Sequence, residues 1–223
     1  MIIVISGQAG SGKDTAADFI VEKFGFVKVG LADILKRICK EIFDFSDERL
    51  YGPSEKRGEP DTRYLRGKDY LSSRLALITL GQAGRDCYES VWADYALRIS
   101  KILIEDKSVM YTQQEGLVQR VEQTSMGEWE RDNAPKKGTI PGVVISDGRY
   151  FNEIMTFKKE NAFLIRIIRS NLPYNKYAGH LSESGQSEIP DNIFDEVVMN
   201  DGSKEDLYAE ITKIMQEKLG FGH

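Results

Sequence analysis

The chain has 223 residues, 41% of them hydrophobic, which is enough for one α/β domain with insertions or for two small domains. Lysine and arginine number 30 against 35 aspartates and glutamates, and a net charge of −5 disfavours a generally basic nucleic-acid-binding protein. Two cysteines (Cys39, Cys87) and two histidines (His180, His223) exclude a disulfide scaffold and a Cys-rich zinc site. They also leave little room for a Ser-His-Asp triad. No apolar run reaches the roughly 18 residues of a membrane span, so we expect a cytoplasmic protein.

The first 45 residues show a strand–turn–helix pattern. Residues 2–6 form a continuous β-branched run, which is typical of a strand buried on both faces of a parallel sheet. This run lacks the basic flank and the cleavage site of a signal peptide. A Gly-rich turn over 7–12 and a helix over 15–24 follow it, and a short strand over 26–29 and a helix over 31–45 come next.

The middle of the chain is less regular. Residues 46–70 are polar, charged and rich in Gly and Pro, which indicates a loop-rich insertion and not a core element. Helical spacing returns over 71–80 and 90–104. Residues 111–142 contain several glycines and prolines, and we expect this stretch to be largely irregular.

The last third restores the alternation of strands and helices. We expect strands over 143–146, 163–168 and 194–199, helices over 152–160 and 203–219, and a polar excursion over 170–190. Strands that alternate with helices predict an α/β fold, with a parallel sheet flanked by helices.

The residues from Gly7 to Thr15 carry the strongest signal. Gly7, Gly12 and Lys13 match the G-x-x-x-x-G-K pattern of a phosphate-binding P-loop, although the hydroxyl of Thr15 comes one place later than usual. Glycines let backbone N–H groups converge on one anion, and the following helix adds its positive end. The alternative is a plain Gly-rich turn. The expected ATP-phosphate residues are Gly7, Gly10, Ser11, Gly12, Lys13, Asp14 and Thr15.

Two carboxylates are candidates for Mg²⁺. Asp14 takes the place of the usual metal-binding hydroxyl, and a carboxylate beside phosphates would repel them without a cation. Asp147 ends the strand over 143–146, at the sheet edge where ligands bind. A carboxylate at this position can hold Mg²⁺ through water. The alternatives are a first-turn acid that favours the helix dipole for Asp14 and a capping role for Asp147.

Other candidates follow the strands. Arg149 and Arg169 come just after two strand ends and are expected to reach phosphate oxygens. The excursion over 170–190 is where a lid would lie, the alternative being an ordinary surface loop. Glu153 opens a helix and either caps it or contacts substrate.

The insertion supplies cations and aromatic rings that suit a phosphate and a stacked base. Arg57, Arg63 and Arg85 are the main candidates for an acceptor phosphate, and Arg74 is a further one. A solvated charged face is the alternative for this region.

Taken together, these pieces resemble a known family. The motifs are Gly7–Thr15, Leu31-Ala32-Asp33 with Lys36-Arg37, Tyr51–Arg57, Leu80-Gly81 with Gly84-Arg85, Trp92, Ile145–Glu153 and His180-Leu181-Ser182-Glu183. The set is similar to the bacteriophage deoxynucleoside monophosphate kinases over nearly the whole chain. Gly148 departs from the family pattern, which usually has Val at that position.

The resemblance implies one P-loop NTPase kinase domain over 1–223, with an inserted substrate-binding region over 46–140 and a lid over 170–190. The implied reaction transfers the ATP γ-phosphoryl group to a deoxynucleoside monophosphate (dNMP), with Mg²⁺, in a host cytoplasm if the gene is viral. The implied catalytic residues are Lys13, Asp14, Arg149 and Arg169. Asn200, Asp201 and Gly202 would lie near the donor adenine, and Lys36, Arg57, Arg63, Tyr64, Arg85, Trp92 and Glu153 would hold the dNMP.

Two other functions stay open. A P-loop kinase for a non-nucleotide acceptor, such as phosphomevalonate or dephospho-coenzyme A, fits the same loop, and so does a non-catalytic nucleotide-binding module. A GTPase is disfavoured because Asn175-Lys176-Tyr177-Ala178 lacks the acid of the guanine signature. We expect no duplex nucleic acid and no membrane as partners. The sequence leaves open which dNMPs are accepted and the oligomeric state, a homodimer included.

Overall fold

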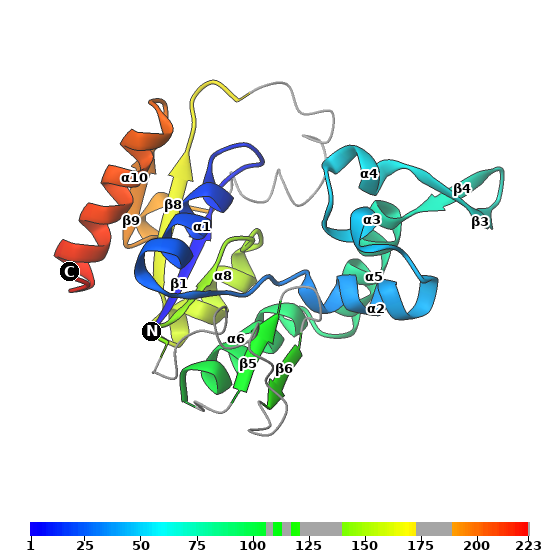
Figure 1. Cartoon of the computed structure of the whole chain (residues 1–223), viewed down its shortest axis with the longest axis horizontal. Coiled ribbons are helices and arrows are strands. Elements are labelled where there is room, and N and C mark those ends of the chain that lie inside the picture. Colours follow the sequence, from blue (N-terminus) through cyan, green and yellow to red (C-terminus); the bar gives the residue numbers. More distant parts are fainter. Residues whose placement is uncertain (106–108, 113–116, 121–139, 173–188, 223) are drawn as a thin grey trace, which may run out of the picture.

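The computed structural model describes residues 1–105, 109–112, 117–120, 140–172 and 189–222. Its centre is a parallel five-stranded sheet in the order β2-β7-β1-β8-β9 (Figure 1). The strands are β1 (Ile2–Ser6), β2 (Val27–Lys28), β7 (Val143–Ile145), β8 (Phe163–Ile168) and β9 (Glu196–Met199). The predicted α/β fold with a parallel sheet is confirmed.

Helices cover both faces of this sheet because β1 alternates its side chains between two cores. Ile3 and Ile5 pack against α1 (Lys13–Phe24) and α10 (Lys204–Lys213). The chain then continues from α10 into a π-helical turn over Ile214–Lys218. No helix in the described part of the chain is both long and apolar enough to cross a membrane.

The other face is covered by α6 (Val91–Glu105) and α8 (Phe151–Lys159), which pack on Ile2 and Val4. Every residue of β1 is buried, so its continuous β-branched run reflects two apolar faces and not one. β1 is the middle strand of the sheet, and the loop that follows it therefore lies at the centre of the sheet edge.

Residues 33–87 form a separate structural unit beside the sheet, here called the insertion module (Figure 1). Its elements are α2 (Asp33–Phe43), α3 (Asp47–Tyr51), α4 (Ser54–Gly58), β3 (Pro60–Arg66), β4 (Asp69–Ser72) and α5 (Ser73–Cys87). The module has its own small core, in which Leu50 is fully buried with Cys39, Phe45 and Ala76.

The prediction that 46–70 is a loop-rich stretch outside the core was therefore wrong. The two helices in it are five residues long, too short to show a helical period in the sequence. The hairpin of β3 and β4 turns at Gly67, whose φ of +66° favours glycine. Its strands mix exposed and half-buried residues, so they lack a clean alternation.

The predictions for the rest of the middle region have a mixed outcome. The expected helices over 71–80 and 90–104 correspond to α5 and α6, and α5 begins where the Ser72 hydroxyl accepts the Leu75 N–H at 3.3 Å. The stretch from 111 was expected to be irregular, but β5 (Val109–Thr112) and β6 (Leu117–Arg120) pair as an antiparallel hairpin. Residues 121–139, and 173–188 of the expected lid, lie outside the described residues, as do His180 and Glu183.

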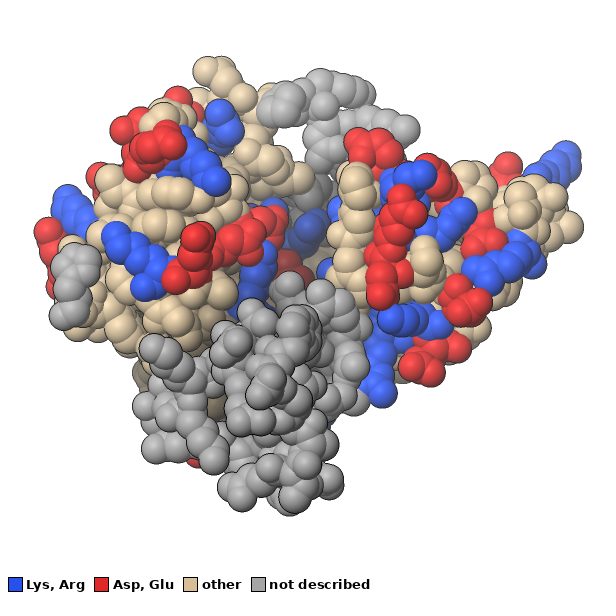
Figure 2. Space-filling view, viewed as in Figure 1, with Lys and Arg blue, Asp and Glu red and all other residues tan. Residues whose placement is uncertain are grey.

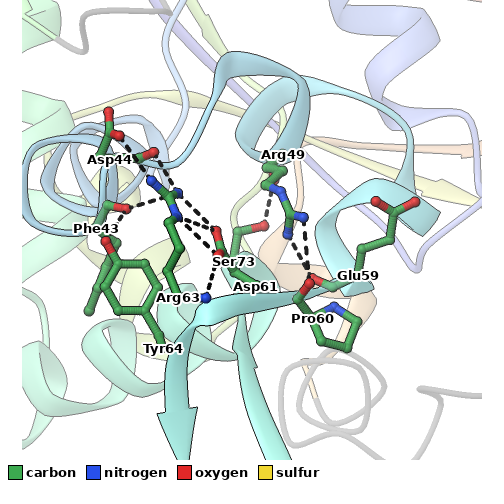
Figure 3. Close-up of polar contacts among 9 residues, drawn as sticks. All are labelled: Phe43, Asp44, Arg49, Glu59, Pro60, Asp61, Arg63, Tyr64 and Ser73. Atoms are coloured by element: carbon green, nitrogen blue, oxygen red, sulfur yellow. Dashed lines mark hydrogen bonds and ion pairs between the residues drawn. The ribbon is translucent and has the colours of Figure 1, made fainter.

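Arg63 ties the hairpin to the end of α2 (Figure 3). Its guanidinium donates to the carboxylate of Asp61 at 2.9 Å and to that of Asp44 at 3.0 Å. The neighbouring Tyr64 hydroxyl donates to the Phe43 carbonyl at 2.7 Å. The hydrogen bonds from Arg63 lower the pKa of Asp61 to about 2. Arg63 and Tyr64 therefore hold the module together.

We predict that Arg63→Gln destabilises the protein in a pH-dependent way. The pKa of Asp61 lies below its usual 3.8, so the stabilisation by this pair is fully present above about pH 4 and is lost as the pH falls toward about 2. Urea-unfolding midpoints of wild type and variant should differ by a constant amount from pH 6 to pH 4 and converge below it. Arg66→Gln, at an exposed position of the same strand, is the matched control. A gap that is unchanged at pH 2.5 would contradict this role.

Candidate active site

The loop between β1 and α1 has the backbone that a phosphate cradle needs. Gly10 and Gly12 have φ values of +84° and +99°, which L side chains rarely adopt. A Cβ at Gly12 would overlap Asn200 Nδ2, and this amide donates to the Ser11 carbonyl at 2.7 Å. Asn200 is buried, so it braces the P-loop from the end of β9.

Gly7 and Ser11 shape the loop from within. A Cβ at Gly7 would lie 2.5 Å from Ser11 Oγ, so the glycine makes room for the serine side chain. Ser11 Oγ is buried and has no hydrogen-bond partner among the described residues. Neither residue lines the cavity described next, so their part in ATP binding stays a prediction that concerns the backbone.

A cavity of about 540 Å³ lies at the N-terminus of α1. It is lined by Gly10, Gly12, Lys13, Asp14, Thr15, Arg169, Asn200, Gly202, Ser203, Lys204 and Leu207. The structure thus brings the P-loop together with Arg169 and with two of the three residues expected near the adenine. Lys204 was missed, because in the sequence it is an ordinary charged residue in the first turn of a helix.

Asp201, the third of those residues, does not line the cavity. Its two carboxylate oxygens accept the Ser170 N–H at 2.7 Å and the Ser170 hydroxyl at 2.8 Å. These hydrogen bonds lower the pKa of Asp201. Asp201 therefore ties the end of β9 to the end of β8, directly beside Arg169.

Asp14 is held beside the cavity by three neighbours. Its Oδ1 accepts the Ser146 hydroxyl at 2.8 Å and lies 3.5 Å from Lys28 Nζ, and its Oδ2 lies 3.3 Å from Lys13 Nζ. Burial acts to raise the pKa of Asp14, but the charge of Lys13, the Ser146 hydroxyl and the charge of Lys28 outweigh it, and the pKa is lowered. Sequence reasoning missed Lys28, since a strand residue gave no sign that it would reach the P-loop.

Both carboxylate oxygens of Asp147 accept hydrogen bonds from the backbone. They accept the N–H groups of Leu31 at 2.9 Å and Ala32 at 3.3 Å, and so hold the chain that enters α2. No group of three or more His, Cys, Asp or Glu side chains suited to a metal occurs in the described part of the chain. One or two carboxylates fit Mg²⁺ that is held mainly by substrate phosphates. Asp14 lines the cavity, and its part in holding Mg²⁺ stays a prediction.

Three arginines, here called the arginine cluster, interact electrostatically near Asp14 of the P-loop. Burial lowers the pKa of Arg57, and the nearby charges of Arg74 and Arg149 lower it further, while Asp14 acts in the opposite sense. Arg57 and Arg74 come from the insertion module and Arg149 follows β7, so the cluster joins the module to the sheet. Figure 2 shows Lys and Arg side chains in the hollow between these two parts. A bound anion would offset these charges.

The other predicted substrate residues have different neighbours. Arg63 and Tyr64 bind the base of the hairpin, as described above. The Trp92 indole N–H donates to the Gly81 carbonyl at 2.9 Å, which joins α6 to α5. Lys36 Nζ lies 3.6 Å from Asp33 Oδ1 and 4.7 Å from the ring centre of Tyr51. These contacts are structural, and the part of the four side chains in dNMP binding stays a prediction.

Glu153 is buried, with 4% of its surface exposed. Its Oε2 accepts the N–H groups of Arg149 at 2.9 Å and Tyr150 at 3.1 Å. Burial raises the pKa of Glu153 to about 7, with a further increase from Asp147, while the two N–H groups and the charge of Arg85 act to lower it. Of the two roles expected for Glu153, the structure shows the capping role.

The fold and this site define a P-loop kinase: a phosphate cradle at the centre of a parallel sheet, with a second group of cations facing it. The chain is 30% identical over 211 residues to the "Putative deoxynucleotide monophosphate kinase" of Acanthamoeba polyphaga mimivirus, which covers 95% of this chain and 94% of that protein. It therefore belongs to the nucleoside monophosphate kinase-like family, and the phosphotransferase class expected from the sequence is confirmed. These matches do not support membership of a bacteriophage branch in particular.

Two other known proteins align with this chain. The "Cytidylate kinase" of Natronomonas pharaonis is 34% identical over 124 residues, 49% of this chain and 61% of that protein. A solved dephospho-CoA kinase from Campylobacter jejuni aligns with a TM-score of 0.44 and 13% identity, over 97% of this chain and 96% of that one, and at that level we draw nothing from it. No protein-family model matches the chain.

We predict that Glu153 makes the stability fall as the pH rises. Its pKa of about 7 in the folded state lies above the usual 4.5, so its stabilising contribution is full below about pH 4.5 and is lost through about pH 7. The difference corresponds to about 3 kcal/mol. Glu153→Gln should remove this slope from the unfolding free energy measured in urea between pH 5 and 8. Glu41→Gln, an exposed change on α2, should keep it, and a slope that survives in Glu153→Gln would refute the assignment.

Proposed function

We propose that the protein is a deoxynucleoside monophosphate kinase that converts ATP and a dNMP into ADP and a dNDP. The observation that carries the proposal is the arginine cluster: the charges of Arg74, Arg149 and P-loop Asp14 all act on Arg57, and Figure 2 shows Lys and Arg side chains in the hollow between the sheet and the insertion module. One cation group suits a donor triphosphate and the other an acceptor monophosphate. The printed name of the mimivirus relative supports deoxynucleotides as the acceptor class.

On the donor side, the ATP phosphates would lie at the N-terminus of α1. The first N–H groups of a helix have no intrahelical partners, and the helix dipole favours an anion there. Lys13 and Arg169 line the same cavity and would neutralise the phosphate oxygens. Asn200 would contribute indirectly, by holding the loop at the Ser11 carbonyl, while Gly202 and Lys204 line the cavity wall.

On the acceptor side, the cluster contains Arg57 and Arg74, both predicted as candidates for the acceptor phosphate, together with Arg149, which was predicted for the transfer centre. Arg74 is itself oriented, since its guanidinium donates to the Ser54 carbonyl at 2.9 Å. A guanidinium can hold a phosphate through two parallel N–H bonds, which fixes orientation as well as charge. The insertion module would thus present the dNMP phosphate to the P-loop.

The transfer needs no covalent enzyme intermediate. An oxygen of the acceptor phosphate attacks the γ-phosphorus of ATP, the bond to the β–γ bridging oxygen breaks, and ADP leaves with that electron pair. The attacking oxygen is already anionic, so no strong general base is required. The protein aligns the two nucleotides and offsets the charge between them.

Mg²⁺ would supply further charge neutralisation at the phosphate oxygens when it is bound with ATP. Asp14 would hold it, because this carboxylate lines the cavity and the lysines and hydroxyl around it favour its ionised form. Asp147 remains a candidate through water, since both of its oxygens already accept backbone N–H groups.

We predict that Arg57→Ala separates the two substrates. Loss of a charge-assisted phosphate contact should raise the KM for dNMP by about 10- to 100-fold and leave the KM for ATP nearly unchanged. Arg57→Lys should recover only part of the loss, because it has the charge without the fork. Two-substrate kinetics test this, with Arg66→Ala as the control. Equal effects on both KM values would place the acceptor elsewhere.

We predict that Lys13→Ala lowers kcat by several orders of magnitude with the fold intact, because this charge acts on the transferring phosphoryl group. The assay is coupled ADP release with each dNMP, each ribonucleotide and phosphomevalonate as acceptors. Turnover should appear with deoxynucleotides and disappear in the variant. Near-normal ADP production by Lys13→Ala, or turnover with phosphomevalonate alone, would refute the proposed function.

A further inference from the structure

Four of the five residues between β7 and α8, here called the 147–150 loop, are held by hydrogen bonds to other segments. The Asp147 carboxylate accepts two N–H groups of the chain before α2. The Gly148 carbonyl accepts the buried Ser6 hydroxyl at 2.9 Å. The N–H groups of Arg149 and Tyr150 both donate to Glu153 Oε2. Such dense anchoring leaves the loop backbone little freedom.

Close packing adds to this restraint at Gly148. A Cβ there would lie 3.0 Å from Ile154 Cδ1 and 3.2 Å from Val4 Cγ1, which is tighter than ordinary van der Waals contact. The glycine thus lets the loop lie directly against β1 and α8.

Tyr150 connects the loop to the insertion module. The Arg85 guanidinium of α5 lies over the Tyr150 ring, 4.5 Å from its centre, and its charge acts on buried Glu153. Arg85 Nε is buried and has no hydrogen-bond partner in the described part of the chain. These contacts direct Arg85 toward the 147–150 loop, whereas the sequence had suggested the acceptor phosphate.

The position of Arg149 matters because its charge acts on the insertion module. The charges of Arg149 and Arg74 both act on Arg57 and lower its pKa. A flexible backbone would let Arg149 move away from the other two. A misplacement of about 1 Å is enough to cost about 100-fold in rate.

We propose that Glu153 and the Arg85–Tyr150 pair are positioning residues that hold Arg149 in the arginine cluster. Glu153 fixes the backbone of Arg149 from α8, and Arg85 fixes the neighbouring ring from the insertion module. The acceptor-binding module and the transfer centre therefore meet on one loop. This inference rests on the proposed function for its kinetic consequences but not for its structural ones.

The kinetic test compares Glu153→Met, which removes the acceptor oxygen, with Glu153→Gln, which keeps one. Glu153→Met should lower kcat by about 10- to 100-fold with a smaller change in the KM for ATP, and Glu153→Gln should recover most of the loss. In an Arg149→Ala background Glu153→Met should cost almost nothing more, because it acts through Arg149. The proposal is overturned if Glu153→Met lowers kcat equally with and without Arg149, or if it does not lower kcat in the otherwise wild-type protein.

The structural test is amide hydrogen exchange at Arg149 and Tyr150, which needs no substrate. Exchange should be faster in Glu153→Met and in Arg85→Met than in wild type, and unchanged in the control Glu41→Met on the exposed face of α2. If Glu153→Met does not fold, Arg85→Met and its Arg149→Ala double variant carry both tests. Unchanged amide exchange at Arg149 and Tyr150 would overturn the proposed positioning role. Absence of dNMP turnover in the wild-type protein would overturn only the proposed function.

Discussion

The placement of cations around the P-loop is the constraint on which this site depends. Lys13 and Arg169 line the cavity and Lys28 lies beside Asp14, while the charges of Arg74 and Arg149 act on Arg57. Carboxylates offset part of this charge: Asp14 lies near Lys13 and Lys28, Asp18 lies 2.8 Å from Lys28, and Glu55 acts on Arg57. Further interactions hold these side chains in place, and under the proposed function the bound phosphates would offset the remaining charge.

Polar side chains at the strand ends hold the loops of the site in place, because they form hydrogen bonds with backbone groups. Asn200 holds the P-loop, Asp201 holds the residue after Arg169, and Asp147 holds the entry to α2. Glu153 does the same for Arg149 from the first turn of α8. Residues that look catalytic in sequence can thus serve by orienting their neighbours, since a carboxylate or amide at a strand end readily reaches the next loop.

The division between sheet and insertion module also has a physical logic. The module has its own core around Leu50 and is tied together by the Arg63–Asp61 pair, so it is a preformed unit. It meets the sheet through Arg57, through the Arg85–Tyr150 contact and through the helix α6 that follows it. Such a unit can move slightly against the sheet without a change in its internal geometry. This property would suit a module that presents one substrate to another.

The sequence by itself determined the parallel sheet and the P-loop after its first strand, and it indicated Lys13, Asp14 and Arg169 at the edge where the strands end. These follow from local patterns: buried runs, a glycine spacing and polar residues at strand ends. Only the tertiary structure decided which arginines meet, because Arg57, Arg74 and Arg149 are far apart in the chain and Arg63 looks the same in sequence as Arg57. The secondary structure of residues 46–70 and the burial of Glu153 also depend on contacts between segments that are distant in the sequence. A local hydrophobic period does not reveal such contacts.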